Sequence, residues 1–439
     1  MSRVCRRVDI RRRPANLRRP VIRNRHHQLP ARARPRLTGT EHYLRDAPGG
    51  GRGSHGVHHR HEGFTVGPVH RTRVNGMPRA IVVDRGQWLG FRWQRHGLDG
   101  QSRKDVLDDL LLLGFQDSRQ AGAEQWLIQR TSRIGSTSVT KTISPDGPLV
   151  SLWSVRGAPH AHRVTHLDFI RDALAPQESD ESGANYVEAV EEVSAALRDA
   201  VTGPTSKSKA SSDVANHVSA SLVEWCARCK ADHVPDALFR AAGRQAQIVL
   251  GPQEQRATML HPTPEHQQEK VDHPRLALLN AYLRVNGPTG RTLFRNWMEG
   301  DTGATADLWK ELGDALVRIE VDNRRYDLPE ILADAVKKAP KPRGVVLVPP
   351  NDPYLRQVDR TLLVPDSNRR QQVWRALSGP GALLVDGEVA GTWRYRHSDH
   401  EVTITSFESL APAQRTEAKK SAHLIAKATG DSQPTVTWV

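Results

Sequence analysis

Hydrophobic positions recur every three or four residues in the first part of residues 276–329. At that spacing one helix face is formed by Leu276, Leu279, Tyr282 and Leu283. Gly287-Pro288 ends this helix, because the pair favours a turn. Thr289 and Thr305 are each placed to cap a further short helix. The inward side chains of these two helices are Leu293, Phe294, Trp297, Leu308, Trp309 and Leu312.

A β-rich pattern follows the three helices. Residues 316–321 favour a strand, Asp322-Asn323 favours a tight turn, and a second strand begins at Arg324. Three helices and a hairpin are the order of a winged helix-turn-helix unit, whose third helix fits a DNA major groove. A helical bundle that supports other domains has the same order, so both interpretations stay open.

Residues 77–180 show a related pattern of helices followed by strands. A helix is expected over residues 105–113, a loop over 115–118, and then a helix that contains Trp126. Residues 138–143 and 149–155 are β-rich and flank Pro145-Asp146-Gly147-Pro148, which predicts a hairpin.

The pattern repeats in form, without residue identity, over residues 181–270. Helices are expected at residues 187–201, 215–229 and 235–243, with a soft Ser/Lys-rich stretch at 205–213 and two strands near Gly251-Pro252.

The last hundred residues are rich in strands. A hairpin is expected around Asp386-Gly387, a helix over residues 412–428, and a final strand over 435–438. The chain therefore predicts an α+β protein with tandem winged helix-turn-helix units. Their predicted bounds are residues 77–180, 181–270 and 271–339, with a β-rich domain over 340–439 and a disordered tail over 1–76.

Charge is concentrated in the tail. Residues 1–76 contain 18 Arg, no Lys and four acidic residues, which accounts for the whole net charge of +14 and leaves the body formally neutral. One interpretation is a nucleic-acid-binding arm. We favour another, that these residues are translated GC-rich sequence upstream of a true start at Met77, because Arg without Lys is unusual.

Cysteine and hydrophobic content indicate the class of protein. Three Cys do not form a disulfide framework, and no apolar run reaches the ~18 residues of a membrane helix. We expect a soluble cytoplasmic monomer. Cys226, Cys229 and His233 have a zinc-ligand spacing, but no second Cys-His cluster follows, and two small residues on one face of a helix also suit packing. We favour packing here and expect no other cofactor.

Several polar residues are candidates for a site. His160 and His162, between Arg156 and Arg163, suit either a polyanion site or acid–base work, and equally an ordinary surface turn. Gln116 and Asp117 follow the first expected helix, where an amide can orient water and a carboxylate can act as a base or stabilise a cation; loop residues of these types are usually only solvated.

Five stretches together resemble the bacterial winged-helix DNA-binding family that includes the AlkZ and YcaQ DNA glycosylases. They are residues 111–118 (LLLGFQDS), 152–160 (LWSVRGAPH), 282–289 (YLRVNGPT), 348–355 (VPPNDPYL) and 381–394 (GALLVDGEVAGTWR). The resemblance implies tandem winged-helix units that form a channel for double-stranded DNA. Residues expected to contact the DNA are Arg156, His160, Arg163, Arg324, Arg325 and Arg394.

The resemblance also implies a catalytic motif, Gln-apolar-Gln or Gln-apolar-Asp, that holds the attacking water. Gln116 matches its first position, Asp117 is polar where the family is apolar, and Ser118 stands at the third. Gln116 and Asp117 are therefore the expected catalytic residues. Two hypotheses follow: a DNA-binding protein without catalysis, which we favour from the sequence because of this departure, and a glycosylase for alkylated or crosslinked bases.

Overall fold

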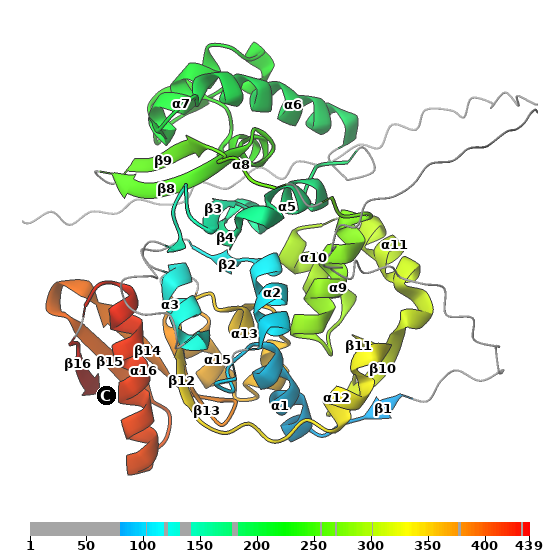
Figure 1. Cartoon of the computed structure of the whole chain (residues 1–439), viewed down its shortest axis with the longest axis vertical. Helices are drawn as coiled ribbons and strands as arrows, with labels where there is room; N and C mark the ends of the chain where they lie inside the picture. The colour runs from blue at the N-terminus through cyan, green and yellow to red at the C-terminus, as the bar shows by residue number, and fades with distance from the viewer. Residues whose placement is uncertain are drawn as a thin grey trace, which may run out of the picture. The chain divides into compact units, whose positions relative to one another are not determined.

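The computed structural model describes ten stretches of the chain. They are residues 80–101, 103–117, 122–131, 142–177, 183–254, 257–267, 270–300, 302–375, 379–431 and 433–439. The tail predicted to be disordered, the alternative start at Met77, and Ser118 lie outside the described residues. The described part is α+β, as predicted: its strands form several sheets, and helices lie beside them (Figure 1).

The helical pattern around Leu279 forms three helices and a hairpin in the expected order. The elements are α9 (Pro274–Asn286), α10 (Arg291–Met298), α11 (Thr302–Leu312), β10 (Leu316–Val321) and β11 (Arg324–Pro329). Asp322 and Asn323 join the two strands with φ of 47° and 59°, the left-handed pair of a two-residue hairpin.

The two predicted caps in this segment are wrong. Gly290 is the N-cap of α10, and Thr289 instead exchanges backbone hydrogen bonds of 3.0 and 2.8 Å with Asp327 on β11. Thr305 is buried inside α11, which already begins at Thr302. In both cases packing against the hairpin and the other helices outweighs the local capping preference.

The first helix of the described chain is not predicted by the hydrophobic pattern. Strand β1 (Ile81–Val82) pairs in parallel with β10, and α1 (Arg85–Arg95) follows, capped by Asp84 in a capping box with Gln87. Its buried residues run around most of its circumference, so it lacks the clean amphipathic stripe of a surface helix.

Segments that are distant in the sequence share a six-stranded sheet, in the order β2-β4-β3-β8-β9-β5. Its strands are β2 (Phe115–Gln116), β3 (Leu149–Trp153), β4 (Pro159–Arg163), β5 (Thr205–Ser206), β8 (Ile248–Glu254) and β9 (Ala257–Pro262). The helices beside it are α2 (Lys104–Leu113), α3 (Gly122–Arg130), α5 (Leu167–Ala173), α6 (Gly183–Ala200), α7 (Lys207–Ala215) and α8 (Asp236–Gln245) (Figure 1).

Two predictions about the first segment are corrected. The loop expected at Phe115 and Gln116 is strand β2. Among the described residues, strand β3 forms its hairpin with β4, across the turn at 154–158. Residues 138–141 lie outside the described residues, and Ile143 makes only an isolated bridge with Leu149. Non-local pairing decided the first outcome, and a short local hairpin decided the second.

Two predictions about the second segment are also wrong. The stretch expected to be soft contains helix α7, because the Ser206 side chain caps it by accepting a hydrogen bond from the Lys209 amide. The helix expected over residues 215–229 does not form, because the preceding helix α7 already ends at Ala215. A small hairpin of β6 (Glu224–Cys226) and β7 (Ala231–His233) takes its place.

The C-terminal region is a five-stranded sheet in the order β12-β13-β14-β15-β16. Its strands are β12 (Val345–Val348), β13 (Gly381–Val385), β14 (Glu388–Arg396), β15 (Glu401–Ser406) and β16 (Thr435–Trp438). The predicted turn at Asp386-Gly387 joins β13 to β14, and helix α16 (Pro412–Ala428) packs against β12 and α3 (Figure 1). Short helices α12 (Ala333–Lys337), α13 (Pro353–Arg356), α14 (Arg360–Leu363) and α15 (Ser367–Val373) surround these elements.

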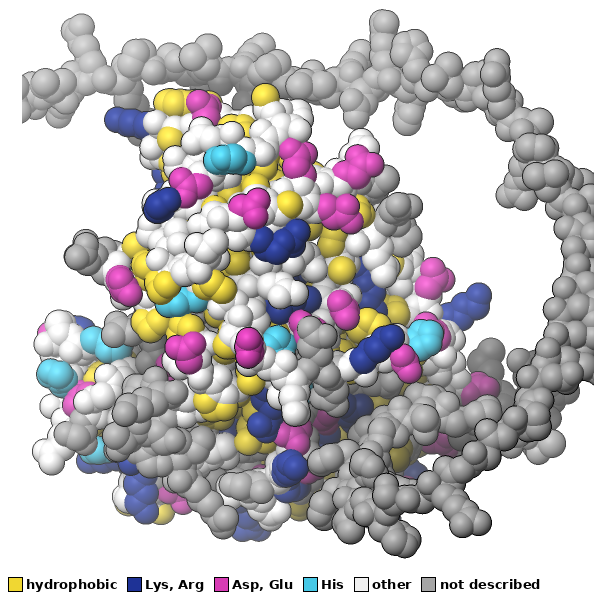
Figure 2. Space-filling model, turned by 45° about the horizontal axis from the view of Figure 1, so that its top comes forward, with side chains coloured by type: hydrophobic (Ala, Val, Ile, Leu, Met, Phe, Trp, Pro, Cys, Tyr) yellow, Lys and Arg dark blue, Asp and Glu magenta, His cyan; other side chains and the backbone are white. Residues whose placement is uncertain are grey.

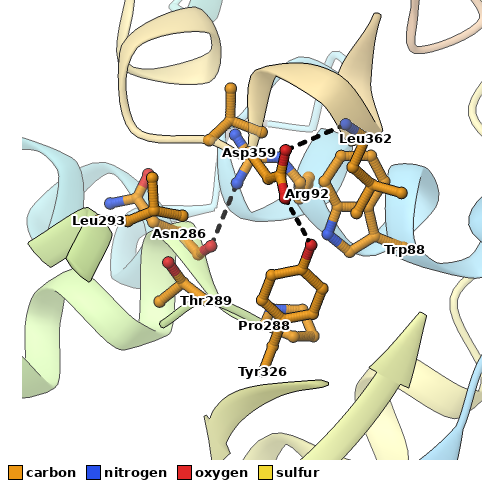
Figure 3. A pocket seen from close by; sticks show the side chains of 10 residues that line it. Trp88, Arg92, Asn286, Pro288, Thr289, Leu293, Tyr326, Asp359 and Leu362 are labelled. Atoms are coloured by element: carbon orange, nitrogen blue, oxygen red, sulfur yellow. Dashed lines mark hydrogen bonds between the residues drawn. The ribbon is translucent and has the colours of Figure 1, made fainter. Parts of the chain in front are cut away.

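A buried polar junction ties α1, α9, β11 and the segment before α14 together (Figure 3). Arg92 donates from Nη1 to the Asn286 carbonyl at 3.1 Å, and the Tyr326 hydroxyl donates to Asp359 Oδ2 at 2.9 Å. These bonds satisfy groups whose burial would otherwise be unfavourable. Among the described residues, no helix combines the length and apolar content needed to cross a lipid bilayer.

Candidate active site

The short strand β2 positions the first candidate pair. Its antiparallel pairing with β4 sets Phe115 opposite Ala161 and Gln116 opposite His160. The Asp117 amide extends this ladder by donating to the Pro159 carbonyl at 2.8 Å. The backbone of Gln116 and Asp117 is therefore fixed against β4, the neighbour of β2 in the sheet.

Gly114 permits this pairing. Its φ of +79° lies in the region that glycine tolerates, and a Cβ built there would lie 2.3 Å from Cε1 of His162. The chain thus turns from α2 into β2 directly against the His162 ring on β4. Any side chain at residue 114 would push β2 away from β4.

Arg156 holds the amide of Gln116. It lies in the turn between β3 and β4 with a φ of +58°, and its Nη2 donates to Gln116 Oε1 at 3.2 Å. Its Nη1 donates to the Trp297 carbonyl at 3.1 Å, which joins α10 to the site. Burial lowers the pKa of Arg156 to about 10, so its guanidinium keeps its charge at neutral pH.

Asp117, the residue after Gln116, is half-buried with its carboxyl towards the start of α3. Burial raises the pKa of its carboxyl to about 6, and the Ala123 amide, which donates to Oδ1 at 3.4 Å, opposes that shift. A carboxylate with a pKa near 6 is ionised at neutral pH and still basic enough to take a proton.

Glu124, in the first turn of α3, is a second carboxyl that the sequence did not single out. Burial, and next the charge of Asp117, raise its pKa to about 7. Its Oε2 is buried without a hydrogen-bond partner among the described residues. Two coupled carboxyls with raised pKa values are typical of a functional site. Only the fold shows that these two carboxyls interact, since seven positions separate Asp117 and Glu124 along the chain.

His160 and His162 are buried and neutral. Burial lowers the pKa of His160 well below its ordinary value and that of His162 to about 3. His160 donates from Nδ1 to the Ala158 carbonyl at 2.9 Å, so its Nε2 carries the free lone pair. A neutral imidazole accepts hydrogen bonds near Gln116 and adds no positive charge for a phosphate.

The remaining predicted DNA contacts lie elsewhere. Arg163, at the far end of β4, pairs with Asp108 of α2. Arg324 forms a close ion pair with Asp359 at 2.8 Å. Arg325 beside it is 72% exposed, and its ion pair with Glu320 is longer, at 3.7 Å. Arg394 is exposed on β14. Only Arg156 and His160 of this set join Gln116 and Asp117.

Surface charge among the described residues is mixed. In the face shown in Figure 2, basic and acidic side chains alternate and form no extended area of one sign. This agrees with the zero net charge of the body. Attraction of a polyanion would therefore depend on individual arginines. Chemically, a cation-bound amide beside an ionisable carboxyl can hold a water molecule and stabilise a developing positive charge.

Comparisons with known proteins found a matching family model and a similar fold. A family model described as DNA glycosylase AlkZ-like matches residues 107–428, which is more than half of the 439 residues. Among solved structures, the chain is similar to the Streptomyces sahachiroi DNA glycosylase AlkZ, with a TM-score of 0.61 and 18% identity, covering 82% of this chain and 100% of that one. At that identity the structural likeness shows a shared fold. No curated protein sequence matches the chain.

Proposed function

Because the chain belongs to the AlkZ-like DNA glycosylase family, we propose that it hydrolyses the N-glycosidic bond of an alkylated base in double-stranded DNA. An alkylated purine is a cation, and it leaves the sugar readily. The enzyme then needs to stabilise the positive sugar and supply a water molecule. The observation that carries this proposal is the amide of Gln116, which Arg156 holds in place on β2.

Each site residue has a distinct role in this proposal. Gln116, oriented by Arg156, holds the water through its amide. Asp117 stabilises the positive charge on the sugar and accepts the proton of the attacking water, since its carboxyl is largely ionised above pH 6. Asp117 lies one position before the acidic residue of the family motif, and the raised pKa of its half-buried carboxyl supports this substitution of role.

DNA would reach the site through the helix-and-hairpin units. We propose that α9, α10, α11 and the β10–β11 hairpin form a winged helix-turn-helix unit, with a related unit around the six-stranded sheet. Arg325, near the hairpin turn, is 72% exposed and lies 3.7 Å from Glu320, so it is better placed to contact phosphate than Arg324, which Asp359 engages at 2.8 Å.

A second candidate is DNA binding without catalysis. Ser118 at the third motif position favours it, because a hydroxyl is a weaker partner for a cationic sugar than a carboxylate. The two candidates differ in one product: a glycosylase leaves abasic sites.

The experiment is incubation of the full chain with N7-alkylated duplex DNA, scored for abasic sites. We expect base release from wild type and a loss of about 100-fold or more in Gln116→Ala, since one positioned polar group is worth roughly 3 kcal/mol at a transition state. Gln101→Ala, at an exposed position, is the matched control. If wild type binds this DNA and releases no base, the second candidate replaces the first.

A further inference from the structure

We propose that the β6–β7 hairpin binds a zinc ion through Cys226, Cys229 and His233, as a structural site separate from the proposed catalytic residues. One ligand atom from each of these three side chains lies within 4.8 Å of the others. Both cysteines are free thiols in the structure. The segment is not helical, so the packing of two cysteines on one helix face no longer accounts for them.

The hairpin register brings the ligands to one side. Cys226 pairs with Ala231, and Glu224 pairs with His233. Because side chains alternate along a strand, Cys226 and His233 are diagonal neighbours on one face, while Trp225 and Asp232 occupy the other. The small side chain of Ala231 leaves room opposite Cys226.

The turn presents Cys229 to the same point. Lys230 adopts a φ of +53°, and its amide donates to the Cys226 carbonyl at 2.8 Å. This closes a tight loop over the two residues between the cysteines. A tight C-x-x-C loop of this kind suits a metal thiolate.

The tautomer of His233 is the one that a metal requires. Its Nδ1 lies 2.8 Å from the Val234 carbonyl, which can only accept, so Nδ1 carries the proton. Nε2 is then the nitrogen with a free lone pair, and it is buried facing the Cys226 side chain. Metal-binding histidines are commonly held by such a bond from the other ring nitrogen to a backbone carbonyl.

The ligand set selects zinc. Two thiolates and one imidazole favour a tetrahedral ion of borderline softness. Binding releases the two thiol protons to solvent and forms two sulfur–metal bonds and one nitrogen–metal bond. Cys229 is exposed, so the fourth position faces water.

The hairpin needs such support. Each strand has three residues, of which two are exposed and one is half-buried. A two-stranded hairpin this short is unstable alone in water. The ion would fix the connection between α7 and α8 in place of a hydrophobic core.

Metal content of the purified full chain tests this proposal. We expect zinc equimolar with protein, and a cobalt-substituted form with the thiolate-to-metal absorption band of a tetrahedral site. The double variant Cys226→Ser with Cys229→Ser is expected to lose both the zinc and the band. His423→Ala is the matched control, because His423 is exposed on α16; Cys5→Ser tests the cysteine of the tail.

Three outcomes would overturn the proposal: metal-free protein that does not take up cobalt, zinc retained by the double variant, or a disulfide between Cys226 and Cys229 detected by mass in protein purified without oxidant. Base release is not the readout, so a failure here is distinct from a failure of the proposed glycosylase activity. Cys229→Ser alone, at an exposed position, guards against an unfolded double variant, and its expected result is weaker cobalt binding.

Discussion

At the scale of single residues, burial sets the chemistry of this protein. Asp117 and Glu124 are ordinary carboxyls by sequence, and their surroundings raise their pKa values to about 6 and about 7. Burial also lowers the pKa of Arg156, and its guanidinium still stays charged at neutral pH. The site therefore contains one cation and two carboxyls that titrate near neutrality.

This titration predicts a pH dependence. If the ionised carboxylate of Asp117 stabilises the sugar cation, base release should rise as pH passes through about 6 and level off above it. Asp117→Asn should lower the rate by at least 10-fold and remove that rise, as measured in single-turnover assays from pH 5 to 8. An unchanged profile in the variant would assign the titration to another group, with Glu124→Gln as the comparison.

At the scale of elements, the site depends on where β2 lies. Phe115 and Gln116 form only a two-residue strand, yet its pairing with β4 sets Gln116 opposite His160. Gly114 makes this approach possible through its positive φ and its lack of a side chain. Gly114, which has no reactive side chain, therefore controls where Gln116 and Asp117 lie.

Gly114→Ala should therefore damage the site from outside it. The alanine Cβ must displace the His162 ring, and the residue must keep an unfavourable positive φ. Together these effects should lower the free energy of unfolding by about 2–4 kcal/mol. Urea unfolding measures this. Gly203→Ala is the control, since no atom lies within 4 Å of the added Cβ and no positive φ occurs there. Equal stability of the two variants would contradict the close approach.

At the scale of the whole molecule, buried polar bonds join the N-terminal helices to the C-terminal region. Arg130 of α3 and Asp352 form an ion pair of 2.9 Å whose side chains are 1% and 0% exposed. Arg130 also donates to the His96 carbonyl at 2.7 Å. Such a pair orients the segments that it connects, because neither charge is stable alone in the interior.

Arg130→Met should destabilise the protein by about 3–5 kcal/mol, because the Asp352 carboxyl is left buried without its partner. Adding Asp352→Asn should recover part of that loss. Arg325→Met, which removes an exposed pair at 3.7 Å, should change stability by less than about 1 kcal/mol. Denaturant midpoints compare the three, and a small loss in Arg130→Met would show that the pair is not essential.

Local signals in the sequence determined much of the secondary structure. The turns at Asp322-Asn323 and Asp386-Gly387 and the helix over residues 412–428 are confirmed, because each depends mainly on neighbouring residues. The final strand is also confirmed, although it forms by parallel pairing with β15. The short motifs also determined the family, which the family model over residues 107–428 confirms.

Only the tertiary structure decided the site. Pairing of β2 with β4, burial of Asp117 beside Glu124, and the engagement of Arg324 by Asp359 all join residues that the sequence keeps apart. The hairpin at Cys226 appeared where a helix was expected, because strand pairing outweighed local periodicity. A pKa or an ion pair depends on distance and on burial, and both arise only when separate segments pack together.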